Sequence, residues 1–471
     1  MILRTKLLVL TLFIPFLSVL SQKPKKADKV TLANLGSHIR YLADDKLEGR
    51  RAGTPGEKLA SDYISIAFLQ AGLQPKGDNN GWLQDFGINE GKRVSPDTYF
   101  GVNNQEFALE KDYFPLAYSA TGTVSGSPAI ALREQGVPWF LDLKDILEAG
   151  QNDPHFDLDE VIRNKTTEYV KKGATALILY NSSKIADNLA FVPGDRSGPV
   201  SVPVIYITRQ AKRKYLKDES ASLDIKIRVG FTEKKRTGHN VIGYLDNGAP
   251  ATVIIGAHYD HLGYGEDSNT LYRGPERLIF HGADDNASGV AAIIELARLL
   301  KGSGLRNNNY LFVAFSGEEL GLSGSRYFVE HSVTDLRKVD YMINMDMIGR
   351  LNDSSHVLTI GGYGTSPAWA EICNHVPDKN YFTLKFDSSG MGPSDHTSFY
   401  TRGIPVLFFC TGMHGDYHMP SDSYDKINYI GELQVLKYIY GVVEYANTKG
   451  KLVFSKTRDM QTGGMNRFSG E

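Results

Sequence analysis

The apolar run Val253-Ile-Ile-Gly-Ala257, followed by the polar residues His258-Tyr-Asp260, decides the fold class of this sequence. A short apolar run bounded by polar residues is typical of a strand that is buried on both faces of a sheet. The later segment 290–300 has apolar residues at helical spacing. A strand, loop and helix pattern is therefore expected to begin near residue 237.

Strand and helix segments alternate from there toward the C-terminus. Further apolar strands are expected at residues 311–315, 341–347, 357–360 and 406–409, with a closing helix at 427–446. This alternation predicts an α/β fold with a mostly parallel mixed sheet and helices on both faces. Ligands of such sheets bind at the carboxyl ends of the strands.

With 471 residues the chain is long enough for two or three domains. The α/β domain is expected to be split in sequence, over residues 27–109 and 236–449. Between the two parts, residues 110–235 show short strands and turns with one helix ending at Lys172, which indicates an inserted small β-rich module. Residues 450–471 are expected to form a loose polar tail.

Residues 1–21 have the pattern of a secretory signal peptide. Arg4 and Lys6 precede an apolar run over residues 7–20, and small and polar residues follow. The run is shorter than the roughly 20 residues that span a bilayer, and Pro15 would break a buried helix. We therefore expect an exported protein, periplasmic or secreted, with no membrane attachment after cleavage.

Charge and cysteine content exclude several classes of site. The chain has 52 Lys and Arg against 54 Asp and Glu, and it lacks the basic stripe of a nucleic-acid-binding protein. Two cysteines, Cys373 and Cys410, are too few for a Cys-rich zinc site or a disulfide scaffold. Whether they pair or remain free thiols is left open. A metal in this protein must be held by His and carboxylate side chains.

Acidic and imidazole side chains gather at the expected strand ends. They are His258, Asp260, Asp284, Asp285, Glu318, Glu319, Asp346 and His418. Carboxylates that converge on one crevice repel each other unless cations neutralise them, and this donor set suits zinc or a similar divalent ion. Two ions about 3.5–4 Å apart would need a shared ligand. In the pair Glu318-Glu319, one carboxylate can bind metal while its neighbour takes a proton from a metal-activated water.

This ordered set of residues resembles the secreted bacterial di-zinc aminopeptidases, which are related to glutamate carboxypeptidase, the transferrin receptor and glutaminyl cyclase. The resemblance covers most of the chain. Its motifs lie at residues 41–56, 258–260, 282–289, 316–325, 344–349, 394–399 and 416–422.

The resemblance implies two zinc ions per chain and a set of ligands. One zinc would be held by His258, Asp285 and Asp346. The other would be held by Asp285, Glu319 and His418, so that Asp285 bridges the two ions.

The same resemblance implies three further roles. Glu318 would be the general base, and Asp260 would orient the imidazole of His258. Tyr417 would stabilise the oxyanion of the tetrahedral intermediate. The neighbouring residues Asp284, His261, His281, His396 and His414 are expected to be loop residues or hydrogen-bond partners, not ligands.

Two regions depart from the pattern or match it less closely. Residues 259–283 put about two dozen residues between the first histidine and the bridging aspartate, and either line a specificity pocket or form a surface loop. Residues 110–235 resemble a protease-associated domain, chiefly through 169–181 and 202–207.

The expected function is therefore that of an exported di-zinc exopeptidase, with an aminopeptidase acting on peptide or protein N-termini favoured. The alternatives are a glutaminyl-peptide cyclase with one metal, a carboxypeptidase of the same fold, or a non-catalytic binding protein.

Overall fold

A computed structural model describes residues 26–151, 156–195 and 197–457. The expected signal peptide and residues 458–471 of the expected tail lie outside these residues. The chain forms two compact units: unit 1 includes the chain up to Asp85 and again from His239, and unit 2 spans Phe86–Gly238. The chain passes from one unit to the other within two strands that pair, β2 (Leu83–Val94) and β11 (Phe231–Leu245).

Unit 1 is built on a nine-stranded sheet with the order β1-β11-β13-β12-β14-β17-β15-β16, in which β2 also pairs with β11. The central strands β13, β12, β14 and β17 are parallel, whereas β11 and β15 join them antiparallel. Bounds of the strands not yet given are β1 (Gln74–Pro75), β12 (Thr252–His258), β13 (Asn309–Phe315), β14 (Val339–Met345), β15 (Val357–Gly361), β16 (Thr383–Phe386) and β17 (Val406–Cys410).

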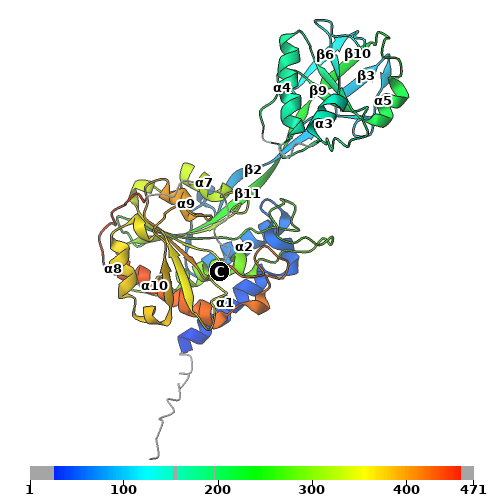
Figure 1. The fold of residues 1–471 in the computed structure, drawn as a ribbon. Helices are drawn as coiled ribbons and strands as arrows, with labels where there is room; N and C mark the ends of the chain where they lie inside the picture. Colours follow the sequence, from blue (N-terminus) through cyan, green and yellow to red (C-terminus); the bar gives the residue numbers. More distant parts are fainter. Residues whose placement is uncertain (1–25, 152–155, 196, 458–471) are drawn as a thin grey trace, which may run out of the picture. The chain divides into compact units, whose positions relative to one another are not determined.

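Helices cover both faces of this sheet (Figure 1). On β12, Val253 and Ile255 pack into the larger core with α1, α2, α6, α8 and α10, whereas Ile254 packs into a second core with α7 and α9. The bounds are α1 (Lys26–Leu42), α2 (Pro55–Gln70), α6 (Gly289–Lys301), α7 (Ser323–Glu330), α8 (Ala368–His375), α9 (His396–Tyr400) and α10 (Tyr429–Ala446). The predicted α/β fold with a mostly parallel mixed sheet is confirmed.

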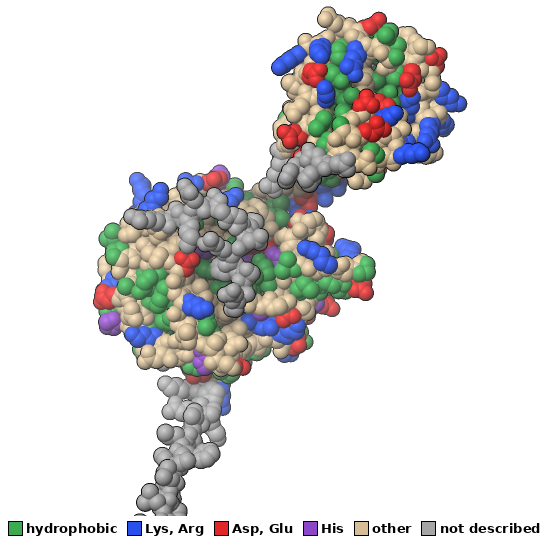
Figure 2. Space-filling view, viewed as in Figure 1, with side chains coloured by type: hydrophobic (Ala, Val, Ile, Leu, Met, Phe, Trp, Pro, Cys, Tyr) green, Lys and Arg blue, Asp and Glu red, His purple; other side chains and the backbone are tan. Residues whose placement is uncertain are grey.

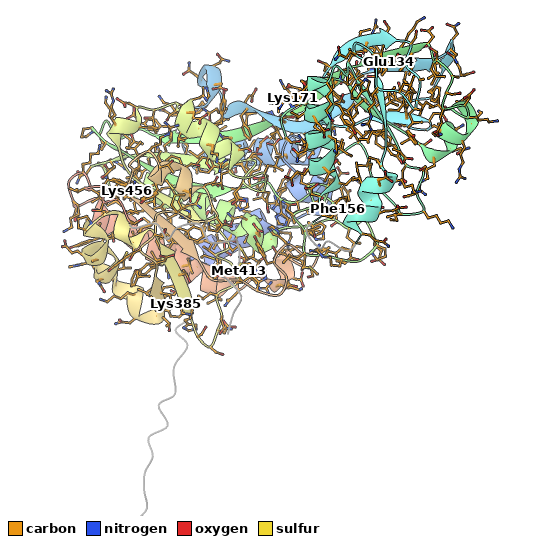
Figure 3. All side chains as sticks on the ribbon, turned by 45° about the horizontal axis from the view of Figure 1, so that its top comes forward. Glu134, Phe156, Lys171, Lys385, Met413 and Lys456 are labelled. Atoms are coloured by element: carbon orange, nitrogen blue, oxygen red, sulfur yellow. The ribbon has the colours of Figure 1, made fainter. Side chains whose placement is uncertain are left out.

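The described residues of unit 2 form two small sheets and three helices. One sheet has the order β4-β3-β10-β6 and the other β5-β9-β8-β7. The strands are β3 (Tyr99–Val102), β4 (Gln105–Glu106), β5 (Tyr113–Pro115), β6 (Gly122–Gly126), β7 (Trp139–Asp142), β8 (Leu177–Tyr180), β9 (Val204–Ile207) and β10 (Ile225–Val229). The helices are α3 (Lys144–Gly150), α4 (Leu158–Lys171) and α5 (Arg209–Tyr215). Phe156 and Lys171, labelled in Figure 3, lie close to the two ends of α4.

The observed start of unit 2 corrects the expected boundary at residue 110. The unit begins at Phe86, within β2. The residues of β3 belong to it because β3 pairs with β10 over four residue positions and so lies in the same sheet as the rest of the unit. Helices α3 and α5 also add to the single helix expected there.

The expectation of a loose tail is wrong for residues 450–457, which pack on unit 1. Leu452 is 6% exposed, and its N–H donates to Asp340 Oδ1 at 2.7 Å. The N–H of Ser455 donates to the carbonyl of Thr365 at 2.8 Å, and Phe454 packs against the core that contains Tyr400. The apolar side chains of Leu452 and Phe454 therefore hold this segment on unit 1, where Lys456 is labelled in Figure 3.

Cys373 and Cys410 are free thiols. Acidic and basic side chains are interspersed on the visible face of each unit (Figure 2). No helix within the described ranges is both long and apolar enough to cross a membrane.

Candidate metal centre

The predicted site residues meet at one edge of the sheet of unit 1, where the parallel strands end. His258 is the last residue of β12, and Glu318 and Glu319 follow β13. Asp346 directly follows β14. Asp285 lies in the π-helical turn Ala283–Ser288 before α6, and His418 lies in the loop after β17, which also contains Met413, labelled in Figure 3.

The first predicted set of metal donors is closely grouped. The Nε2 atom of His258 lies 3.3 Å from Asp285 Oδ1 and 3.2 Å from Asp346 Oδ1. Burial favours the neutral imidazole, but the carboxylates of Asp346 and Glu318 outweigh it and raise the pKa of His258 well above its usual value. Without a metal ion, these carboxylates therefore favour a positively charged group at the position of the first donor set.

The second predicted set shares Asp285 with the first. The Nε2 atom of His418 lies 3.3 Å from Asp285 Oδ2 and 3.3 Å from Glu319 Oε2. Although burial favours the neutral acid, the imidazoles of His261, His258 and His418 hold the pKa of Asp285 well below its usual value. Asp285 thus presents one oxygen of an ionised carboxylate to each set.

These separations fit zinc. Donor atoms bound to a tetrahedral zinc at roughly 2.0–2.1 Å lie about 3.3 Å apart, close to the 3.2 and 3.3 Å observed between the histidine nitrogens and carboxylate oxygens. Asp285 Oδ2 is also buried and has no hydrogen-bond partner among the described residues. The donors present are therefore suited to two divalent ions that share Asp285.

His261 is a second imidazole beside Glu319. Its Nδ1 lies 2.9 Å from Glu319 Oε1, and 3.8 Å from Asp285 Oδ2. The shorter distance is that of a hydrogen bond to the carboxylate oxygen that faces away from His418. His418 has its Nδ1 at 2.6 Å from the carbonyl oxygen of Asn269, and histidine ligands usually donate their second N–H in this way. The donor atoms of His261, Asp285 and Glu319 also lie close enough together to hold a metal ion. The bond from His418 to Asn269 is the observation in favour of His418 as the ligand, with His261 as a residue that orients Glu319.

Asp260 links the first histidine to the predicted base. The carbonyl oxygen of Asp260 lies 3.2 Å from Nδ1 of His258, whereas its carboxylate Oδ1 lies 3.7 Å from the same atom. That carboxylate instead accepts the N–H of Glu318 at 3.1 Å. The backbone carbonyl of Asp260 therefore makes the closer contact to the imidazole of His258. The side chain of Asp260 holds the backbone of Glu318, the predicted general base.

Glu318 lies in an environment that disfavours its charged form. Burial raises its pKa well above the usual value; the ring of His258 opposes this effect, and the carboxylates of Glu319 and Asp346 add to it.

Tyr417 stacks on the ring of His418 with 3.9 Å between ring centroids. Burial and the nearby carboxylates of Asp285 and Glu319 raise the pKa of Tyr417. Tyr417 is therefore neutral, and its ring lies against that of His418.

The remaining histidines near the motifs have other partners. His414 Nε2 lies 3.1 Å from Asp284 Oδ2, and His281 Nε2 lies 2.8 Å from Asp45 Oδ1. His396 is buried and stacks on Phe408. These three residues are not part of either donor set.

Arg50 is a buried cation near the donor sets, and the sequence predicted no role for it. It is 1% exposed and donates to the carbonyl of Tyr259 at 2.7 Å, and to those of His281 at 2.7 Å and Gly282 at 3.0 Å. A further bond goes to the carbonyl of Leu42. Arg50 therefore joins the chain after His258 to the chain before Asp285. The only sequence signal was its place in the motif at residues 41–56.

Asp422 is a second residue without a predicted role. Its carboxylate accepts the N–H of Asp284 at 3.0 Å and that of Asp285 at 3.1 Å. It therefore fixes the turn that carries the shared ligand.

The fold is similar to that of an aminopeptidase from Aneurinibacillus sp. strain AM-1, with a TM-score of 0.50 and 23% identity over 91% of this chain and 96% of that one. The aminopeptidase YwaD of Bacillus subtilis is 29% identical over 272 residues, which are 54% of this chain and 53% of YwaD. A probable leucine aminopeptidase of Aspergillus oryzae matches over 49% of its length, so the chain spans about half of each of these two relatives.

Two further matches decide the family. The probable lipoprotein aminopeptidase LpqL of Mycobacterium tuberculosis is 30% identical over 419 residues, which cover 80% of this chain and 73% of LpqL. The model of Peptidase family M28 matches residues 240–442, the part of unit 1 that contains every proposed metal donor. On these grounds the chain belongs to Peptidase family M28.

Proposed function

We propose that this protein is an exported di-zinc aminopeptidase that hydrolyses the N-terminal peptide bond of peptides or proteins. The observation that carries the proposal is the pair of donor sets, His258, Asp285 and Asp346 against Asp285, Glu319 and His418, with separations of 3.2–3.3 Å. Export rests on the signal-peptide pattern of residues 1–21. The relatives named as aminopeptidases support the reaction class.

The chain's own residues divide the work of hydrolysis. Two zinc ions would supply Lewis acidity toward the scissile carbonyl and lower the pKa of a water molecule. Glu318 would accept the proton of the attacking water and deliver it to the leaving amine. Its backbone N–H is held by Asp260, which fixes Glu318 beside the donor sets. Tyr417 would donate a hydrogen bond to the oxyanion.

Unit 2 has no catalytic role in this proposal. We propose that Phe86–Gly238 is a protease-associated domain inserted into the catalytic domain, on the basis of the resemblance of residues 169–181 and 202–207. Its deletion with a short linker would show whether it affects the choice of substrate.

The direct test combines metal analysis with a substrate panel. The purified mature protein should contain two zinc ions per chain and cleave one or more aminoacyl p-nitroanilides, and a chelator should abolish cleavage until zinc is restored. N-acetylated versions of the same substrates should not be cleaved. One zinc per chain with cyclisation of N-terminal Gln peptides would establish the cyclase alternative instead. Cleavage of N-blocked peptides from the C-terminus would establish a carboxypeptidase, and no turnover of any member would contradict the proposal.

A further inference from the structure

We propose that Asn269 is a positioning residue of the metal centre. Residues 262–280, which contain it, then support ligands of that centre and are not an independent surface loop. The inference rests on the proposed di-zinc function. It concerns the second donor set, formed by Asp285, Glu319 and His418.

Asn269 contacts two of these donors at once. Its carbonyl oxygen accepts the Nδ1–H of His418 at 2.6 Å. Its side-chain amide donates to the carbonyl of Glu319 at 3.1 Å and to Glu319 Oε2 at 3.4 Å. Because Nδ1 of His418 donates to this carbonyl, Nε2 is the ring nitrogen left to bind a metal, and it lies beside Asp285 and Glu319.

The residues after Asn269 hold the backbone of His418. The carbonyl of His418 accepts a hydrogen bond from Thr270 Oγ1 at 3.2 Å and another from the N–H of Leu271 at 3.1 Å. His418 has a φ of 53°, in the left-handed region that side-chain-bearing residues rarely adopt. These contacts therefore stabilise both the ring orientation and the unusual backbone conformation of this ligand.

The segment is itself anchored at both ends. The N–H of Gly263 donates to the carbonyl of Gly49 at 3.1 Å, and the N–H of Phe280 donates to the carbonyl of Gly263 at 2.9 Å. Asp267, near the middle, accepts two bonds from Arg51, at 2.6 and 2.7 Å. Gly49 has a φ of 68°, and a Cβ there would lie 2.5 Å from the carbonyl oxygen of Gly263, so the anchor requires glycine. A segment fixed in this way can define the position of Asn269.

The contacts are asymmetric between the two donor sets. Among the described residues, the hydrogen bonds of Asn269 go to His418 and Glu319, whereas Nδ1 of His258 has the carbonyl of Asp260 as its partner. N269A keeps the backbone carbonyl to which His418 donates and removes only the two side-chain bonds to Glu319. Loss of these bonds should weaken the second zinc site and spare the first.

The test measures zinc binding to N269A by equilibrium dialysis against buffered zinc, with the full chain. We expect one zinc to bind as in the wild type and the affinity for the second to fall about 10- to 100-fold. The cobalt-substituted protein provides a second readout, since the absorption of one of two Co²⁺ ions should be lost first. R273A is the matched control, because Arg273 is exposed and hydrogen-bonds to carbonyls of its own segment, those of Thr270 and Tyr272.

Four outcomes would contradict the inference or the function on which it rests. Wild-type affinity for both ions in N269A would overturn the role of Asn269. Equal weakening of both sites, or a lower unfolding temperature of the metal-free variant than of metal-free R273A, would also overturn it, by showing a general structural effect. Fewer than two zinc ions in the wild type would contradict the proposed function itself.

Discussion

The backbone N–H of Glu318 donates to Oδ1 of Asp260 at 3.1 Å. This bond ties the proposed base to the residue whose carbonyl holds the ring of His258. The buried side chain of Asp260 therefore adds a link between the loop that carries Glu318 and the end of β12, which also pairs with β13.

Replacement of Asp260 by Asn should impair metal binding and turnover together. The variant loses the negative charge beside His258, and its amide can satisfy the Glu318 N–H only when its oxygen takes the place of Oδ1. We expect zinc affinity and kcat/KM each to fall about 10- to 100-fold, as measured by zinc titration and p-nitroanilide hydrolysis. D340N is the control, because Asp340 is also buried in unit 1 but accepts the N–H of Leu452, away from the donor sets. An unchanged zinc affinity in D260N would contradict this role.

Substitution at the two adjacent glutamates should separate catalysis from metal binding. In E318Q we expect kcat to fall about 100- to 10,000-fold, since a general base is lost, with zinc content unchanged. In E319Q we expect one of the two zinc ions to be lost, because Glu319 Oε2 belongs to the second donor set. Zinc analysis of both purified variants beside the wild type is the measurement, and loss of zinc from E318Q would make Glu318 a ligand instead.

Arg50 should be important for the stability of the metal-free protein. R50M leaves the carbonyls of Tyr259, His281 and Gly282 without their donor in a buried place, which should lower the free energy of unfolding by about 3 kcal/mol or more. R50K keeps the charge but lacks the planar guanidinium, so its loss should be intermediate. Urea unfolding in the presence of a chelator is the measurement, so that loss of metal does not contribute.

The control for R50M is R337M. Arg337 pairs with Asp335 on the surface, with 91% of its side chain exposed, and such pairs contribute about 0–1 kcal/mol. Equal effects of R50M and R337M would show that the buried bonds of Arg50 contribute no more than a surface pair.

The candidate ligands could be predicted from the sequence because ligand chemistry is a property of side chains. His258, Asp285 and Asp346 have the residue types that metals select, and each lies next to an apolar segment whose burial is predictable. The parallel sheet then brings these segment ends together. The fold class and the grouping of polar residues at the strand ends follow from this connection between apolar pattern and topology, whereas the role of each ligand follows from the resemblance to the di-zinc aminopeptidases.

The supporting contacts could not be predicted, because they depend on backbone atoms. Arg50 bonds to carbonyl oxygens more than 200 residues away in sequence, and Asn269 accepts from His418 through its own carbonyl. Every residue has a carbonyl, so residue type does not identify these partners. The start of unit 2 was misplaced for a related reason, since the four-residue strand β3 belongs to that unit through its ladder with β10.

His396 should make stability depend on pH. Burial lowers its pKa from 6.5 to about 3, so between these values the unfolded chain takes up a proton that the folded chain does not. The free energy of unfolding should therefore be unaffected by this residue above pH 6.5 and should decrease as pH falls below it, by at most about 1.4 kcal/mol per pH unit. H396F keeps a ring that can stack on Phe408, where the centroids are 4.6 Å apart, but cannot titrate. Urea unfolding at pH 7 and pH 5 should show the wild type losing about 2 kcal/mol more than H396F; parallel losses in the two proteins would mean that the buried imidazole is protonated in the folded state.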